Sequence, residues 1–257
     1  MRVVQLIWAD SRGKVITLLL LLWILVLTQQ FQWMFVVTVC IAVATTMGLD
    51  LVLGKIRFGM WKFSLSSVLT GLLIGMIMDP LGGFIPVSFA SIIAVLSKQF
   101  FKKKEGKHIL NPASVGIVIA SLMFNRPVAW WSVAWGMVSA VLIAVWMFFV
   151  LKRLRRIWIS VTFLIIYILI NVPSARLVGA VRLTIDSTVF LFAWVMLVEP
   201  VTSPGMGRWK YGWGILVGLL VYVQNLLGQS WTDPLLLGLL GANVIIALVP
   251  KKKFTTP

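Results

Sequence analysis

The sequence contains very little cysteine, histidine or acidic side chain. Its 257 residues include one cysteine, one histidine, and 7 Asp and Glu against 23 Lys and Arg. A single cysteine excludes a disulfide within the chain and cannot by itself build a zinc site or an iron–sulfur cluster. A single histidine excludes metal clusters that need a second imidazole. We therefore expect no metal site, and no side chain is assigned a catalytic role.

Charged side chains as a group are also scarce. They make up 12% of the residues, whereas soluble domains contain about 25%. Hydrophobic residues make up 60% of the chain, and its mean hydropathy is +1.02. These values indicate an integral membrane protein surrounded by a lipid bilayer. In a soluble protein the net charge of +16 would suggest nucleic acid, but membrane topology explains the charge better, and no nucleic-acid partner is expected.

Ten apolar segments reach, or nearly reach, the length of about 20 residues that a helix needs to cross a bilayer. They lie at 14–28, 34–53, 63–78, 84–96, 112–124, 132–151, 157–172, 183–198, 211–227 and 234–249. The first, fourth and fifth are short and are expected to use flanking residues or to be partly re-entrant. The sequence therefore predicts an all-α integral membrane protein with about ten transmembrane helices, in which residues 1–257 form a single polytopic membrane domain.

Basic residues give these helices an orientation, because cytoplasmic loops are enriched in Lys and Arg near the helix ends. With a cytoplasmic N-terminus, 20 of the 23 basic residues fall on the inner side. These are Arg2, Arg12, Lys14, Lys55, Arg57, Lys62, Lys98, Lys102, Lys103, Lys104, Lys107, Lys152, Arg153, Arg155, Arg156, Arg208, Lys210, Lys251, Lys252 and Lys253. Only Arg126, Arg176 and Arg182 fall outside. The pattern predicts a multi-pass protein with both termini in the cytoplasm.

Two pairs of short motifs indicate an internal duplication. Asp79-Pro80 and Glu199-Pro200 each end an apolar segment, 120 residues apart, and Asn111-Pro112 and Asp233-Pro234 each begin one, 122 residues apart. Five crossings would place the second half upside down relative to the first, as an inverted repeat. The approximate halves are 14–124 and 132–249.

The acidic residues of these motifs are candidates for function, because a carboxylate inside lipid is costly and is usually retained for a role. A broken helix end at these positions would offer carbonyl groups to a cation. A half-helix beginning at Pro112 would direct its positive end at an anion or an electron-rich ring. The alternative is that Asn111-Pro112 and Asp233-Pro234 are ordinary helix starts at the membrane interface.

Two segments resemble a known family. Residues 106–116, GKHILNPASVG, and residues 199–204, EPVTSP, are similar to the FNPA and DPVTSP segments of the membrane subunits NqrB and RnfD. These belong to the sodium-pumping NADH:quinone reductase and to the Rnf electron-transport complex. The resemblance implies two inverted five-helix halves in the bacterial cytoplasmic (inner) membrane. It also implies a subunit of an ion-translocating oxidoreductase that passes electrons through flavin, coupled to Na⁺ or H⁺ movement.

The same resemblance assigns site residues and partners. Asp79 and Glu199 would couple ion movement. The residues that would bind the cofactor or line the central site are Asn111, Pro112, Ser114, Gly116, Thr202 and Ser203. Other membrane electron-transport subunits would be the partners. His108, beside Lys107 in a basic loop, is expected to be solvated.

One departure from the family concerns the cofactor. Members of those complexes hold FMN through a phosphoester on a threonine, in an outer loop after the fifth helix region. The corresponding residues 124–131 of this sequence, FNRPVAWW, contain no threonine. We therefore expect a short relative that holds FMN or riboflavin without a covalent bond. Two other functions stay open, a small-solute channel or transporter on the same inverted repeat without a redox step, and a structural subunit that anchors partners.

Overall fold

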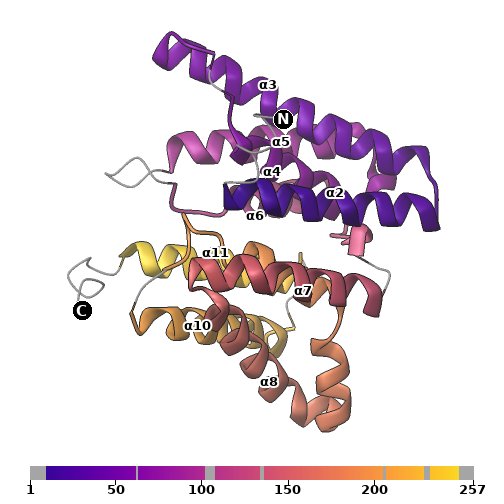
Figure 1. The fold of residues 1–257 in the computed structure, drawn as a ribbon, viewed down its shortest axis with the longest axis vertical. Helices are drawn as coiled ribbons and strands as arrows, with labels where there is room; N and C mark the ends of the chain where they lie inside the picture. The colour runs from indigo at the N-terminus through magenta and orange to yellow at the C-terminus, as the bar shows by residue number, and fades with distance from the viewer. Residues whose placement is uncertain are drawn as a thin grey trace. The chain divides into compact units, whose positions relative to one another are not determined.

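The computed structural model describes residues 10–61, 63–101, 108–133, 136–204, 207–228 and 232–248. The regular elements in these ranges are helices, with no β-strand among them (Figure 1). The prediction of an all-α protein is therefore confirmed for the part of the chain that the structure describes.

The chain divides into two compact units. Unit 1 comprises Met1–Phe101 and Pro112–Ser132, and unit 2 comprises Lys102–Asn111 and Val133–Pro257. The boundary separates Asn111 from Pro112, so the two residues of one predicted motif belong to different units.

Unit 1 is built from α2 (Ser11–Gln29), α3 (Trp33–Phe58), α4 (Leu65–Ile77), α5 (Phe84–Phe100) and α6 (Pro112–Phe124). Each overlaps one of the first five predicted segments. Helix α3 packs against α4 and α5, α5 packs against α6, and α2 packs against α4 (Figure 1). The short 3₁₀ helix η1 (Pro80–Gly82) follows α4, and η2 (Trp131–Val133) lies where the unit ends.

Unit 2 is built from α7 (Met137–Leu154), α8 (Ile157–Thr184), α9 (Ser187–Leu191), the π-helix η3 (Phe192–Met196), α10 (Trp209–Leu226) and α11 (Pro234–Leu248). Helix α10 packs against α8 and α11, whereas η3 packs against α7 and α8. These elements overlap the last five predicted segments, and α11 begins at Pro234 as the sequence predicts. The predicted final residue of that segment, Val249, lies outside the described residues.

Helix α8 is longer than predicted. The sequence predicts a helix over 157–172 followed by a loop, but α8 continues to Thr184. The backbone breaks at Arg176, whose φ of 55° and ψ of 173° lie outside the helical region, three residues after Pro173. A proline removes one helical hydrogen bond and clashes with the turn before it, so Pro173 weakens the helix on its N-terminal side and does not by itself account for the break at Arg176. The helix resumes beyond the kink, so Arg182 lies on a helix and not in a loop.

Closely packed glycines bring helix backbones together in both units. On α4, a Cβ at Gly71 would lie 2.7 Å from the Cα of Val43, and one at Gly75 would lie 2.6 Å from the Cα of Val39. On α10, Cβ atoms at Gly214 and Gly218 would likewise overlap atoms of α8. Glycines four residues apart allow this approach between membrane helices. Each unit therefore contains one helix pair whose contact depends on such a motif.

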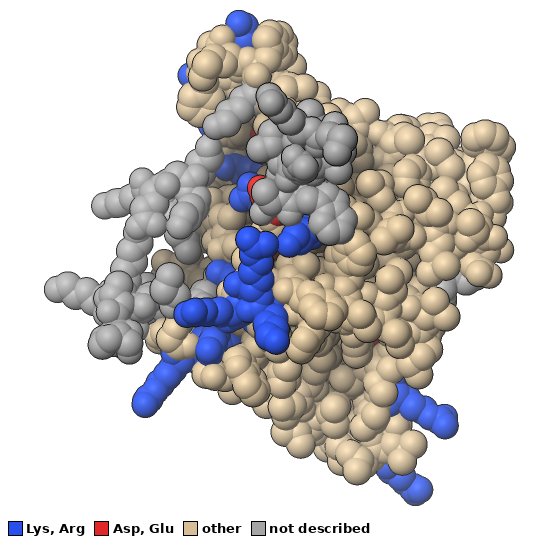
Figure 2. Space-filling model, in the orientation of Figure 1, with Lys and Arg blue, Asp and Glu red and all other residues tan. Residues whose placement is uncertain are grey.

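The exterior is poor in charge. Figure 2 shows a face on which most side chains are neither acidic nor basic, with Lys and Arg gathered in a few places. Among the described helices, α2, α3, α7 and α8 are long and apolar enough to cross a membrane, and several shorter apolar helices accompany them. This combination is that of an integral membrane protein.

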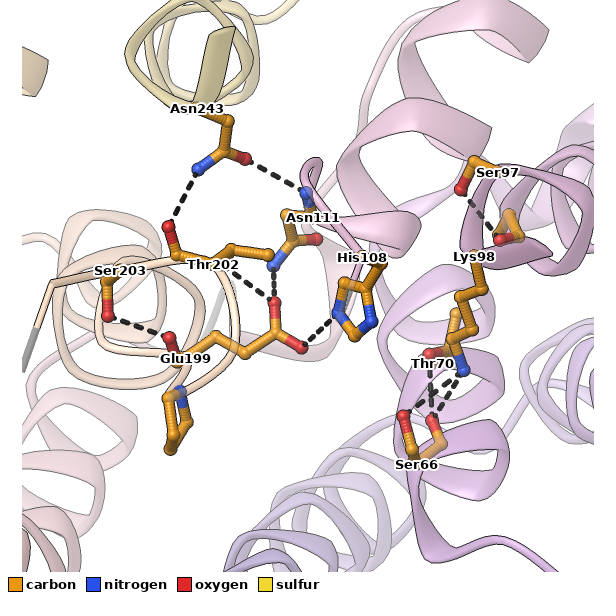
Figure 3. A network of polar contacts seen from close by, with 12 residues as sticks. Ser66, Thr70, Ser97, Lys98, His108, Asn111, Glu199, Thr202, Ser203 and Asn243 are labelled. Carbon is orange, nitrogen blue, oxygen red and sulfur yellow. Dashed lines mark hydrogen bonds and ion pairs between the residues drawn. The ribbon is translucent and has the colours of Figure 1, made fainter. Parts of the chain in front are cut away.

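Some of the predicted inner cations can be located, and others cannot. The cations outside the described residues are Arg2, Lys62, Lys102, Lys103, Lys104, Lys107, Lys251, Lys252 and Lys253. Lys98, which the sequence places on the inner side, lies in the last turn of α5 and is 7% exposed. Its Nζ donates to the carbonyl oxygen of Ser66 at 3.1 Å and to Ser66 Oγ at 3.2 Å (Figure 3). Its charge therefore stabilises the packing of unit 1, in addition to any effect on topology.

Candidate functional site

The chain reaches Glu199 through a widened helical turn. In η3 the N–H of Leu197 donates to the carbonyl of Phe192, five residues back, at 2.9 Å. Two carbonyl groups of this stretch accept bonds from other helices. Ser160 Oγ donates to Ala193 at 2.7 Å and Trp213 Nε1 donates to Leu197 at 3.0 Å. Because backbone polar groups inside a membrane need partners, these side chains stabilise the π-helix directly before Glu199.

Counting only partners that the structure describes, the carboxylate of Glu199 receives three hydrogen bonds. Asn111 Nδ2 lies 2.9 Å and Thr202 Oγ1 lies 3.1 Å from Oε2, while His108 Nε2 lies 3.3 Å from Oε1 (Figure 3). The side chains of His108 and Glu199 are 14% and 18% exposed. The donors come from two segments separated by almost ninety residues, so the fold of unit 2 assembles this site.

A buried asparagine of α11 joins the two segments. Asn243 is fully buried, and its Oδ1 accepts a hydrogen bond from the backbone N–H of Asn111 at 2.9 Å. Its Nδ2 donates to the carbonyl of Thr202 at 3.5 Å. Asn243 thus fixes the positions of Asn111 and Thr202, which both contact Glu199.

Arg156 binds the backbone of the same loop from the other side. Its Nη1 lies 3.4 Å from the carbonyl oxygen of Val198 and 3.3 Å from that of Ser203, and also donates to Ser203 Oγ. Its Nη2 lies 3.4 Å from the carbonyl oxygen of Pro200. One guanidinium therefore satisfies three carbonyl groups of the turn that contains Glu199. Ser203 Oγ in turn donates to the carbonyl of Glu199 at 2.7 Å.

The local sequence explains how Arg156 comes to be buried. Helix α7 ends at Leu154, and the next residue, Arg155, adopts the left-handed conformation with φ of 56°. The N–H of Arg156 donates to the carbonyl of Leu151 at 3.0 Å. This is the bonding of a Schellman motif, which turns the chain sharply at a helix end. Burial in this turn between α7 and α8 lowers the pKa of Arg156, and the negative charge of Glu199 opposes that shift. The guanidinium nevertheless stays protonated.

We call the seven residues of this arrangement the Glu199 cluster. They are His108, Asn111, Arg156, Glu199, Thr202, Ser203 and Asn243. The cluster presents one carboxylate, one imidazole and one fixed positive charge in a largely enclosed position. Such an arrangement can hold and exchange a proton, or present a carboxylate to a cation.

The cluster brings together three of the predicted site residues, Asn111, Glu199 and Thr202, with Ser203 beside them. It also corrects the prediction for His108, which is largely enclosed and bonded to Glu199, not solvated. Arg156 and Asn243 were not predicted as site residues. Asn243 could have been predicted from the sequence, because it is a single polar side chain within the apolar sequence of α11.

The other predicted ion-coupling residue, Asp79, lies in unit 1. Its Oδ1 accepts a hydrogen bond from the N–H of Leu81 at 2.9 Å, so the carboxylate caps η1. Its Oδ2 lies 3.9 Å from Nη1 of Arg126, whose side chain is half exposed. The role of Asp79 in ion coupling stays a prediction, and the structure adds a capping role.

A substitution at Asp79 separates these roles. Asn accepts a capping bond about as well as Asp, so we expect Asp79→Asn to change the free energy of unfolding by less than about 0.5 kcal/mol. Asp79→Ala should lower it by about 1 kcal/mol, because the Leu81 N–H loses its acceptor. Denaturant titration of the purified protein in detergent measures both. Equal losses in the two variants would contradict the capping role.

The remaining predicted residues, Pro112, Ser114 and Gly116, begin α6 in unit 1. All three are buried. A Cβ at Gly116 would lie 2.2 Å from the carbonyl oxygen of Ala90, so this glycine allows α6 to lie against α5. A contribution of these residues to cofactor binding stays a prediction.

The segment in which the family resemblance places the FMN threonine is packed against α4. The N–H groups of Ala129 and Trp130 both donate to the carbonyl of Ile77, at 3.0 and 3.1 Å. Trp131 donates from Nε1 to the carbonyl of Gly75 at 3.1 Å and stacks on Phe35 with ring centroids 4.3 Å apart. With no threonine in this segment, its residues do not fit covalent FMN.

A model of one protein family matches residues 10–139 of the chain, and its description is the NQR2, RnfD, RnfE family. The matched range contains Asp79 and the Asn111–Gly116 motif, whereas Glu199 lies beyond it. No curated protein matches the chain. The match spans half of the sequence and agrees with the apolar helices of the structure, and on this basis the chain belongs to the NQR2, RnfD, RnfE family.

Proposed function

We propose that this membrane subunit of the Rnf and Nqr type passes electrons through a flavin and couples their passage to the movement of Na⁺ or H⁺. The observation that carries the proposal is the Glu199 cluster. A carboxylate with a protein-built set of partners, within a membrane protein of this family, is a functional candidate. Three residues of the cluster, Glu199, Thr202 and Ser203, belong to the EPVTSP segment, which resembles the family and lies beyond the matched range.

The proposal includes ten membrane crossings arranged as inverted halves over 14–124 and 132–249. Several observations support it. Both α6 and α11 begin at a proline preceded by Asn111 or Asp233, and Asp79 and Glu199 both follow the end of a helix. The boundary between units 1 and 2 at Ser132 and Val133 lies close to the proposed boundary between the two halves. The distribution of Lys and Arg supports both termini in the cytoplasm, in a bacterial inner membrane.

The flavin of this proposal is FMN or riboflavin, held without a covalent bond. One cavity of unit 2 has a volume of about 460 Å³, within the range of small-molecule sites. Its polar lining includes Tyr167, Arg182, Asp186, Thr188, Asn225 and Asp233. Two carboxylates against one guanidinium disfavour a phosphate, so the cavity would suit the uncharged ring and ribityl chain of riboflavin better than FMN. Bound flavin would supply the redox chemistry.

The visible absorption spectrum tests the redox proposal. We expect protein purified in mild detergent to show flavin bands, and to lose the flavin after denaturation and removal of small molecules. A colourless protein, prepared with FMN and riboflavin added, would rule out a flavin carrier. Flavin that stays with the denatured chain would contradict the absence of a covalent bond.

Ion coupling is tested by replacing the carboxylate. We expect Glu199→Gln to lower the rate of ion entry into proteoliposomes under an imposed gradient by about 100-fold, the scale at which positioned acid–base groups act. Asp10→Asn is the matched control, because Asp10 caps α2 through the N–H of Arg12 and Asn retains that bond. Equal rates in the wild type and Glu199→Gln would exclude Glu199 from the ion path.

The cavity of unit 2 also gives the alternative function one observation in its favour. A channel or transporter for a small polar solute would use the same polar lining, without flavin. Solute flux into proteoliposomes that contain colourless protein would favour this alternative over electron transfer.

A further inference from the structure

We infer that the ion handled at Glu199 is a proton, which His108 exchanges with the Glu199 carboxylate, and that the Glu199 cluster is not a sodium site. The inference rests on the proposed function, which leaves Na⁺ and H⁺ open. It depends on how the hydrogen-bond donors are divided between the two carboxylate oxygens.

The donors around Glu199 oppose a metal cation. Hard cations bind oxygen ligands and need several of them together. Here Asn111 Nδ2 and Thr202 Oγ1 direct hydrogen atoms at Oε2, and His108 Nε2 lies at Oε1. A sodium ion at either oxygen would meet the positive ends of these groups.

The two oxygens differ in a way that suits a proton. Oε2 accepts two hydrogen bonds, from an amide and from a hydroxyl, neither of which titrates in the physiological range. Within the described ranges, Oε1 has the imidazole as its one partner, at 3.3 Å. The Oε2 bonds therefore hold the carboxyl group in place while the protonation of Oε1 changes.

His108 can transfer the proton because its two nitrogens have different surroundings. Nε2 contacts Glu199, so it carries the hydrogen whenever the carboxylate is ionised. In the part of the chain that the structure describes, Nδ1 has no hydrogen-bond partner. Imidazole is the side chain whose ordinary titration lies between about pH 5 and 8, and this chain contains one histidine.

The transfer moves one proton and no electrons. A proton from water binds Nδ1 of neutral His108 and gives the imidazolium ion. The Nε2–H bond then breaks as an Oε1–H bond forms, which leaves a neutral imidazole with its hydrogen on Nδ1 and a neutral carboxyl group. The reverse sequence returns the proton. Arg156 is the other charged group of the cluster, and it stays protonated throughout.

The experiment uses the single histidine as its own reporter. The full chain, labelled with ¹⁵N-histidine and purified without a histidine tag, is reconstituted in lipid nanodiscs. Nitrogen NMR follows the tautomer and protonation of His108 across pH 5 to 8. Infrared difference spectra follow the protonated carboxyl band of Glu199, which is assigned by its loss in Glu199→Gln. Both measurements are made in Na⁺ and again with K⁺ at the same pH.

We expect the imidazole signals and the carboxyl band to change together with pH, and to be the same in Na⁺ and K⁺. His108→Gln keeps a donor to Oε1 but cannot titrate, so the pH-dependent part of the carboxyl band should be lost over this interval. Asp10→Asn should leave both signals unchanged.

Three results would overturn the inference. These are a carboxyl band that responds to Na⁺ at constant pH, a His108 that does not titrate in this interval, and a carboxyl band that is unaffected by His108→Gln. The measurement needs neither flavin nor redox partners. A failed proton exchange is therefore distinguishable from a failed electron-transfer function, which the visible spectrum tests separately.

Discussion

Replacing Arg156 by alanine is expected to lower the free energy of unfolding by about 3 kcal/mol or more, because hydrogen bonds from charged donors contribute about 1.5–3 kcal/mol each and their buried acceptors would be left unpaired. The carbonyl groups of Val198, Pro200 and Ser203 would lose their shared donor. Since these groups form the turn that carries Glu199, its carboxylate should also lose its fixed position. We expect the variant to lose ion movement together with stability.

Two further variants separate the guanidinium from its charge. Arg156→Lys keeps the positive charge, but an ammonium group lacks the planar, forked donors with which the guanidinium bonds several carbonyl groups at once. We therefore expect Arg156→Lys to be more stable than Arg156→Ala but less stable than the wild type. Arg153→Ala removes a charge from the last turn of α7, where the side chain is exposed, and should change stability by less than about 0.5 kcal/mol. Denaturant unfolding in detergent measures all three. An Arg156→Ala protein as stable as Arg153→Ala would contradict the buried role.

The second large effect is expected at Gly116. A Cβ there would overlap the backbone oxygen of Ala90, which cannot rotate away as a side chain can. Gly116→Val should force α5 and α6 apart and cost about 1–3 kcal/mol, the usual range for overpacking, with Gly116→Ala at the lower end. The measurement is the midpoint of unfolding for each variant.

Gly48→Ala is the matched control, since a Cβ at that position of α3 meets no atom within 4 Å. Alanine is the better helix former, so this variant should be unchanged or more stable by up to about 1 kcal/mol. If Gly116→Ala were equally harmless but reduced flavin binding, the glycine would serve the cofactor and not helix packing.

Much of the fold follows from the apolar segments of the sequence. Segment length and flanking prolines place α6 and α11 correctly at Pro112 and Pro234, because a proline is favourable in the first turn of a helix. The kink at Arg176 and the π-helix η3 could not be predicted in this way. The π-helix depends on side chains of other helices, Ser160 and Trp213, which donate to its carbonyl groups. The kink is a local change of backbone conformation at Arg176. Apolar periodicity carries no information on either.

The site was predictable only in part, for a similar reason. Asn111, Glu199 and Thr202 stand in short motifs that resemble a family, and the structure joins them. Arg156 was predicted only as one of the inner cations, because its position near a helix end can be read from the sequence. The sequence does not show that its guanidinium lies among three carbonyl groups. His108 stands beside a basic segment, and only its tertiary contact with Glu199 distinguishes it from a solvated loop residue.

The π-helix before Glu199 lets the chain hold one extra residue in a single turn without changing the direction of Glu199. A π-turn within a helix contains one more residue than the α-helical turn it replaces. Each residue of an α-helix advances the chain by about 100°. Deleting a single residue from η3 would therefore restore an ordinary helix with Glu199 still directed toward His108 and Asn111. Deleting a second residue would exceed what the widened turn can absorb and would rotate Glu199 by about 100°, although every side chain of the cluster would still be present. One deleted residue in this stretch should consequently be far less damaging to the site than two.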